Sequence, residues 1–284
     1  MGKKVYVGLT ASQIKWIALL FMTIDHLYML CAATQMLLRI VPILRLLGRI
    51  AAPLFLFLIT ESAWHTRSKI RFLVRLYLAG VGTGIFTIVT NMLFGHIMIY
   101  TPGNIFFTLF YTVTYIYLFE YMLIAIRMYD WKLILKSIII AGITLLPQVL
   151  FYLIDRWNFP GIERDTVVFW RELITTIFPP ILHVEYSILF IIMGVGIYFC
   201  KNIRQKCFVF ILFCGVSFIG ALSGGDLYPV NEFMISGQYW MILALPFMYS
   251  YNGDRGNQRK LFFYIYYPVH RYLFALTGGL LQGV

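Results

Sequence analysis

Charged residues are scarce in this sequence. Asp, Glu, Lys and Arg make up 12% of its 284 residues, whereas about 25% is usual in soluble domains. Hydrophobic residues reach 61%, and apolar stretches of about 20 residues recur along the whole length, as in helical proteins that cross the bilayer many times. The composition excludes a water-soluble fold. We predict an all-α, polytopic transmembrane bundle of about nine to eleven helices in a single domain over residues 1–284.

The sequence also lacks the cysteine patterns of metal or disulfide chemistry. It contains no Cys-x-x-Cys pair and no Cys/His cluster at metal-ligand spacing. Its four cysteines are Cys31, Cys200, Cys207 and Cys214. We therefore expect no metal site and no disulfide framework.

Nine apolar segments are candidate membrane helices. They run 13–33, 50–66, 70–93, 104–126, 132–154, 182–200, 206–222, 236–250 and 261–281. Segment 35–49 alternates apolar residues with arginines, which suits a short interfacial or re-entrant helix. Segment 155–181 mixes charged residues with prolines, and we expect it to be the one sizeable loop outside the membrane.

The positive charge, formally +11, is spread along the chain. Groups of Lys and Arg precede the first predicted helix, separate the second from the third and the fourth from the fifth, follow the sixth and precede the ninth. All of these groups then lie on one side, which the positive-inside rule assigns to the cytoplasm. This dispersal excludes a nucleic-acid patch. Arg39, Arg45 and Arg49 fall on the outer side, so either 35–49 folds back into the protein or these arginines have another task.

Three ionisable residues lie deep within predicted helices. Asp25 and His26 come roughly 15 Å past Lys15, and His270 lies about 14 Å into the last helix. Such groups are costly in hydrocarbon unless they face protein or water, so they are functional candidates. A midplane site shared by His26 and His270 is geometrically possible. The alternative is structural: Asp25 and His26 lock helices together, and His270 makes an interhelical hydrogen bond beside Pro268.

Other acidic and imidazole groups lie nearer the cytoplasmic ends of predicted helices. Glu61 and His65 are four residues apart and share a helix face. Glu120 reaches a similar depth, so these residues and the basic stretch 67–75 could frame a cytoplasmic entrance. Each could instead be an interfacial salt bridge or a snorkelling group.

The turn at 251–256 has a composition that suits phosphate binding. Its two glycines, with Asn252 and Arg255, could present backbone amides and a cation to an anion. Any short cytoplasmic turn has a similar composition, so the pattern alone does not separate a phosphate site from an ordinary turn.

A series of short motifs runs along the chain in this order: Lys15-Trp16-Ile17-Ala18, Ile24-Asp25-His26, Leu46 to Phe55, Glu61 with His65-Thr66-Arg67, Asn104 to Thr108, Trp240 to Pro246, Tyr251-Asn252-Gly253 with Arg255-Gly256, and Phe262-Phe263-Tyr264 with Tyr267-Pro268-Val269-His270. Together these motifs resemble the TraX family of bacterial membrane proteins, whose namesake acetylates the N-terminal amine of pilin. The resemblance spans both ends of the chain, whereas about 130–235 has no matching motif.

The resemblance implies a membrane acyltransferase that takes acetyl from cytoplasmic acetyl-CoA and delivers it to an amine or hydroxyl acceptor beyond the cytoplasmic membrane. It indicates acyl transfer more firmly than it indicates pilin. The expected catalytic residues are His26 as general base, Asp25 as its orienting group, Arg49 as ligand of an oxyanion or phosphate, and His270. The expected acetyl-CoA-binding residues are Arg67, Arg71, Arg255, Lys260 and Asn252. The expected substrate-binding residues are Arg45, Glu61, His65, Glu120 and Asn104.

Two other classes of protein fit some of these features. A proton-coupled transporter or flippase would use intramembrane acid, histidine and arginine as a relay, but the sequence shows neither paired halves nor matching broken helices. A non-catalytic membrane scaffold would leave Asp25 and His26 unexplained.

The distribution of Lys and Arg predicts the positions of the two termini. We expect the N-terminus in the cytoplasm and, after nine crossings, the C-terminus outside. Reporter fusions at each end, active on only one side of the membrane, would measure this. Both termini on the same side would contradict nine crossings and point to a further membrane segment within 35–49 or 155–181.

Overall fold

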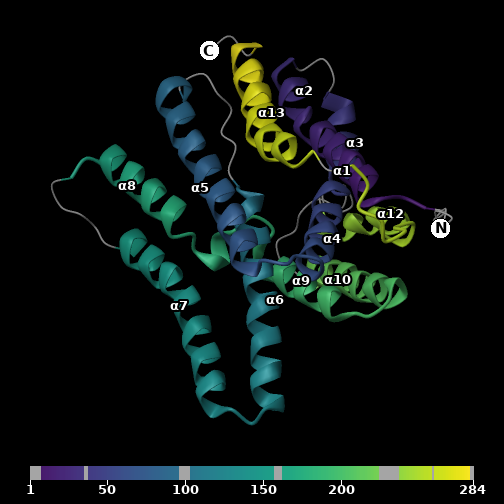
Figure 1. Cartoon of the computed structure of the whole chain (residues 1–284). Coiled ribbons are helices and arrows are strands. Elements are labelled where there is room, and N and C mark those ends of the chain that lie inside the picture. Colours follow the sequence, from purple (N-terminus) through teal and green to yellow (C-terminus); the bar gives the residue numbers. More distant parts are fainter. Residues whose placement is uncertain are drawn as a thin grey trace. The chain divides into compact units, whose positions relative to one another are not determined.

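The computed structural model describes residues 8–34, 38–95, 103–156, 162–223, 237–257 and 259–281 (Figure 1). The described residues are helical apart from turns and one isolated β-bridge between Leu9 and Tyr251, which confirms the all-α prediction. The α-helices are α1 (Ala11–His26), α2 (Tyr28–Thr34), α3 (Val41–Gly48), α4 (Ala51–Trp64), α5 (Lys69–Phe94), α6 (Ile105–Arg127), α7 (Trp131–Arg156), α8 (Arg164–Ile177), α9 (Ser187–Phe199), α10 (Ile203–Ser223), α12 (Leu245–Tyr249) and α13 (Lys260–Leu281). Three 3-10 helices join them: η1 (Leu38–Ile40), η2 (Ile181–His183) and η3 (Gln238–Ala244).

Six helical spans in the described part of the chain are long and apolar enough to cross a membrane. They are Ala11–Cys31, Val41–Trp64, Lys69–Phe94, Ile105–Arg127, Trp131–Arg156 and Ile203–Leu222. Each overlaps a predicted span, because a continuous apolar run of this length forms one membrane helix. That the chain crosses the membrane nine times stays a prediction.

The other three predicted spans are not among these six. The span 182–200 holds η2 and the 13-residue α9. The span 236–250 is wrong as one helix, since η3 gives way to the five-residue α12 at Leu245. Pro246 explains the break, because it has no N–H to continue an α-helical ladder. α13 has 22 residues and contains Pro268.

The two segments expected to lie between spans are also helical. Segment 35–49 contains η1 and α3, and α3 leads through a turn at Arg49 into α4; residues 35–37 lie outside the described ranges. Segment 155–181 is not an irregular loop, because α8 occupies its centre; residues 157–161 lie outside the described ranges, and the position of the segment outside the membrane stays a prediction. The charged residues recur at helical spacing and form the polar side of an amphipathic helix, and Pro179 and Pro180 come only after it ends.

The chain divides into two compact units, which are described separately. Unit 1 comprises residues 1–61, 94–101 and 196–284. In it α1 packs against α3, and α13 packs against α2 and α1 (Figure 1). The turn before α13 holds the start of α1: Ala11 N–H donates to the Asp254 carbonyl at 2.8 Å, and Leu9 N–H donates to the Ser250 carbonyl at 2.7 Å. Unit 1 thereby joins the two ends of the chain.

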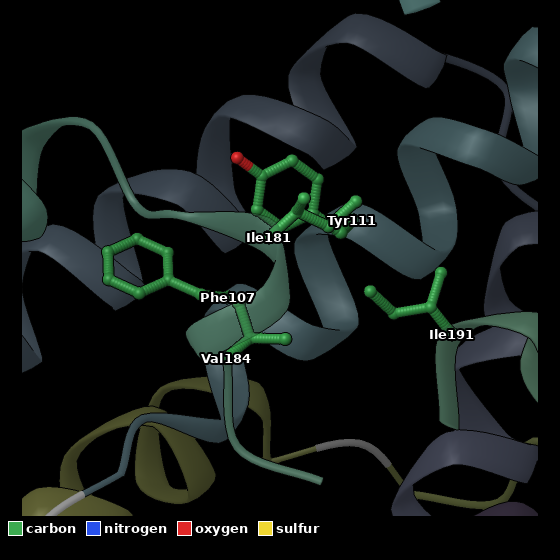
Figure 2. Close-up of a cluster of buried hydrophobic side chains, with 5 residues drawn as sticks. All are labelled: Phe107, Tyr111, Ile181, Val184 and Ile191. Atoms are coloured by element: carbon green, nitrogen blue, oxygen red, sulfur yellow. The ribbon is translucent and has the colours of Figure 1, made fainter. Parts of the chain in front are cut away.

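Unit 2 comprises residues 62–93 and 102–195. Its α6 packs against α7, and α7 packs against α8 and η2. Figure 2 shows a buried apolar cluster that α6, η2 and α9 build together, and its members are Phe107, Tyr111, Ile181, Val184 and Ile191. The Tyr111 hydroxyl donates to the Pro179 carbonyl at 2.5 Å, so the cluster also fixes the chain that follows α8. The expected single domain over 1–284 stays a prediction.

The glycines of α5 allow close helix packing at specific positions. A Cβ atom on Gly80 would lie 2.4 Å from the Phe107 ring, and one on Gly84 would lie 2.5 Å from the Thr176 side chain. A Cβ atom on Gly82 would meet nothing within 4 Å. Small residues on one side of α5 therefore admit α6 and α8, as expected for membrane helices.

This difference predicts opposite effects of the same substitution. Gly80→Ala should destabilise the protein by about 1–3 kcal/mol, since Phe107 must move within the buried cluster. Gly82→Ala should be neutral or slightly stabilising, because alanine favours helix and meets no neighbour. Thermal unfolding of both variants in detergent would measure this. Equal changes in the two melting temperatures would contradict the packing account.

Candidate functional site

Two histidines from opposite ends of the chain meet inside unit 1. His26 is the last residue of α1, and His270 lies in α13. Their rings are 4.9 Å apart between centroids and nearly perpendicular, at 80°. The Nδ1 atom of His26 is 3.2 Å from the Nε2 atom of His270. The structure thus brings together the two imidazoles that the sequence placed at similar depth.

Backbone carbonyls fix the protons of both rings. His26 Nδ1 is 2.8 Å from the Met22 carbonyl oxygen, and His270 Nδ1 is 2.6 Å from that of Tyr266. A carbonyl oxygen only accepts hydrogen bonds, so each Nδ1 carries the hydrogen and donates it. In the neutral rings each Nε2 is then an acceptor. His26 Nε2 has no hydrogen-bond partner among the described residues.

Aromatic packing and a second polar contact hold His270 in place. The Tyr266 ring stacks on the His270 ring, with centroids 4.7 Å apart and an angle of 10°. The Thr23 hydroxyl donates to the Leu19 carbonyl at 2.8 Å and lies 2.8 Å from the Tyr266 hydroxyl, which therefore donates to Thr23. His270 is only 4% exposed. α1 and α13 are thus linked by two polar contacts, one helical turn apart.

Sequence reasoning missed three residues of this region. Tyr266 and Thr23 support the histidine pair, and Arg271 is buried next to His270 with its Nη1 donating to the Tyr267 hydroxyl at 3.2 Å. The spacing from Tyr266 to His270 is four residues, which places both on one helix face. This spacing is the sequence signal from which the contact of Tyr266 with His270 could have been predicted.

Asp25 contacts α3, whereas His26 contacts α13. Gly48, the last residue of α3, is buried, and a Cβ atom there would lie 2.3 Å from the Asp25 side chain. Consecutive helical residues point about 100° apart, which explains the two directions. Arg49 follows directly and buries its Nε, while Arg45 is exposed with its guanidinium 5.3 Å from the centre of the Tyr28 ring. The end of α3 thus brings Arg49 and Asp25 to the same part of unit 1.

Glu61 forms an ion pair with Lys206, and the two side chains are only 13% and 17% exposed. The Lys206 ammonium also lies 6.0 Å from the centre of the Phe57 ring, and the Tyr251 ring packs edge-on against Phe57 at 5.4 Å. Burial, followed by the Glu61 charge, raises the pKa of Tyr251 to about 12. These contacts favour the salt-bridge reading of Glu61. His65 follows the end of α4 and is exposed.

The turn at 251–256 uses its polar groups within the protein. The Asn252 side chain donates to the Gly8 carbonyl at 3.2 Å and accepts from the Asp254 amide at 2.9 Å. Ser12 N–H donates to the Arg255 carbonyl at 3.1 Å. These bonds favour an ordinary turn that caps α1, and the phosphate role of Asn252 stays a prediction. The Arg255 side chain is exposed.

The remaining predicted site residues belong to unit 2 or to the start of α13. Glu120 pairs with Lys69 at 2.5 Å. Asn104 caps α6 and donates to the Gly80 carbonyl at 2.8 Å, so both residues have structural partners. Arg67 and Arg71 are exposed, and the Lys260 side chain lies outside what the structure describes. In the described ranges no three His, Cys, Asp or Glu residues gather closely enough to hold a metal ion.

Comparison with known proteins gives one match. The sequence model of the family described as TraX protein matches residues 10–278, nearly the whole chain. No curated protein and no solved structure matches the chain. The matched residues include both His26 and His270.

The ion pair of Glu61 and Lys206 gives a prediction that separates a structural role from a substrate-binding role. Lys206→Met should destabilise the protein by about 3–5 kcal/mol, because the Glu61 carboxylate stays buried without its ammonium partner. The double variant Glu61→Gln/Lys206→Met should recover most of this loss. Thermal unfolding of both in detergent is the measurement, and a single variant as stable as the wild type would argue against the structural role.

Proposed function

The chain belongs to the TraX family, and from this premise we propose that it is a membrane-embedded acetyltransferase. It moves an acetyl group from cytoplasmic acetyl-CoA to an amine or hydroxyl acceptor at the outer side of the cytoplasmic membrane. The observation that carries the proposal is the contact between His26 and His270, which leaves His26 Nε2 unoccupied among the described residues. A neutral imidazole nitrogen in that state is a general base.

The proposed reaction assigns each proton. His26 Nε2 takes the proton from the acceptor as the acceptor's nitrogen or oxygen attacks the thioester carbonyl. The tetrahedral intermediate collapses, its carbon–sulfur bond breaks, and the CoA thiolate takes the proton back from His26. Proton transfer of this kind contributes about 10²–10⁴ in rate. Products are the acetylated acceptor and CoA, so His26 returns to its starting state.

Arg49 is the proposed stabiliser of the oxyanion. A guanidinium is permanently charged and donates several hydrogen bonds in one plane, which suits the oxygen of a tetrahedral intermediate. Its place after Gly48, which contacts Asp25, supports this role. Asp25 then holds α3 against α1 and supplies negative charge near the Arg49 guanidinium.

The phosphates of CoA belong at the cytoplasmic rim, because they cannot enter hydrocarbon. The exposed Arg255 of unit 1 is the proposed ligand, with Lys260 at the start of α13. For Arg67 and Arg71, which are exposed in unit 2, the acetyl-CoA role stays a prediction. Since the Asn252 side chain bonds Gly8, it supports the turn that carries Arg255. Of the expected substrate-binding residues, Arg45 is exposed and belongs to unit 1, which holds the histidine pair, and we retain it for the acceptor.

A proton-coupled transporter or flippase is the second candidate, and one observation favours it. α1 ends at His26 and α2 begins at Tyr28, with Leu27 between them still in a helical conformation, so the first span departs from regular α-helix only locally beside the histidine pair. Transporters often bind substrates at interrupted helices. The two functions differ in one readout, because an acetyltransferase releases CoA slowly even to water and a transporter does not.

His26→Ala should abolish this CoA release while acetyl-CoA binding persists, since the base is lost and the rim residues remain. The measurement is CoA release from labelled acetyl-CoA by purified protein in nanodiscs, with binding followed by titration calorimetry. His183→Ala serves as control, because His183 packs on Phe151 in unit 2 and should leave turnover unchanged. Turnover of the His26 variant within about threefold of wild type would contradict the general-base role.

A further inference from the structure

We propose that His270 is the positioning residue for His26: its Nε2 lone pair shares the His26 Nδ1 hydrogen and so presents His26 Nε2 to the acceptor. This inference rests on the proposed function for its catalytic meaning. The hydrogen bond between the two rings and the tautomer of His26 do not depend on that function and can be tested without it.

Hydrogen-bond accounting leads to one arrangement of the neutral pair. If His26 carried its hydrogen on Nε2, its Nδ1 lone pair would face the Met22 carbonyl oxygen at 2.8 Å. Two acceptors would then oppose each other. With the hydrogen on Nδ1, the same atom donates to the Met22 carbonyl and to His270 Nε2, 3.2 Å away. Only this tautomer satisfies both contacts.

His270 is built as a rigid acceptor. Its Nδ1 hydrogen is committed to the Tyr266 carbonyl at 2.6 Å, so its Nε2 presents a lone pair. The stacked Tyr266 ring and the edge-on Phe274 ring, with its centroid 6.2 Å away, confine the imidazole plane. The Tyr266 hydroxyl in turn bonds Thr23 of α1. The acceptor is therefore fixed relative to the helix that carries His26.

The arrangement resembles, in its logic, a carboxylate that orients a catalytic imidazole. In such a pair the partner holds the correct tautomer and stabilises the imidazolium that forms. Asp25 cannot be credited with this position at Nδ1, because Met22 and His270 occupy it. When His26 Nε2 gains the acceptor's proton, its Nδ1–H becomes a stronger donor, and His270 Nε2 accepts more of that hydrogen. The proton on Nε2 then leaves with the CoA thiolate.

Solid-state NMR of the full chain, labelled with ¹⁵N-histidine and held in nanodiscs, tests the arrangement directly. We expect protonated Nδ1 on both rings and a through-hydrogen-bond coupling between His26 Nδ1 and His270 Nε2. A hydrogen on His26 Nε2, or no coupling, would overturn the proposal. This spectrum needs no turnover, so it remains informative if the protein releases no CoA and the proposed function fails.

Paired substitutions test the catalytic consequence. His270→Gln keeps an acceptor oxygen near the Nε2 position and should retain kcat within about fivefold, whereas His270→Phe keeps the ring volume without an acceptor and should lower kcat at least tenfold, with the KM for acetyl-CoA unchanged. Trp16→Phe changes packing in the same α1–α13 contact, against Phe262 and Phe263, and should leave kcat unchanged. Equal kcat for the Gln and Phe variants would reduce His270 to a packing role. If the Phe variant does not fold, a tenfold loss in the Gln variant would also contradict the proposal.

Discussion

Hydrocarbon supplies no hydrogen-bond partner, and the arrangement of this protein's polar side chains depends on that constraint. Many hydroxyl groups in the described apolar helices satisfy it locally by donating to a carbonyl one turn earlier. Thr112, for example, donates to Thr108 at 2.8 Å, and Ser137 donates to Leu133 at 2.9 Å. The imidazole of His26 cannot be satisfied wholly in this way, since it has two nitrogen atoms. Its Nδ1 hydrogen reaches both its own helix and α13, and the contact ties the two ends of the chain together.

The same constraint separates structural from chemical polar groups. Three of the predicted site residues have contacts that explain their presence structurally. Glu61 pairs with Lys206, Glu120 pairs with Lys69, and Asn104 donates to the Gly80 carbonyl. In the turn at 251–256, backbone carbonyls likewise accept hydrogen bonds from the first amides of α1. His26 differs, because the surrounding residues orient it and leave its Nε2 without a described partner. A group held in one state but left unoccupied is what general-base chemistry requires.

The sequence was informative about depth and less so about direction. Apolar runs predicted the six long spans, and a rise of 1.5 Å per residue placed His26 and His270 at similar depth. Direction depends on which helices become neighbours, so neither the packing of Asp25 on Gly48 nor the stacking of Tyr266 on His270 could be predicted. Composition misled at α8, where charges mark a helix face, and at 236–250, where Pro246 divides an apolar run.

We propose that acetyl transfer takes place at the histidine pair between α1 and α13. The most direct test is an experimental structure of the chain with a non-hydrolysable acetyl-CoA analogue bound. We expect the acyl carbon within about 6 Å of His26 Nε2, the sum of one hydrogen bond and one near-attack distance, with the phosphates at the cytoplasmic rim. An acyl group bound away from α1 and α13 would contradict it.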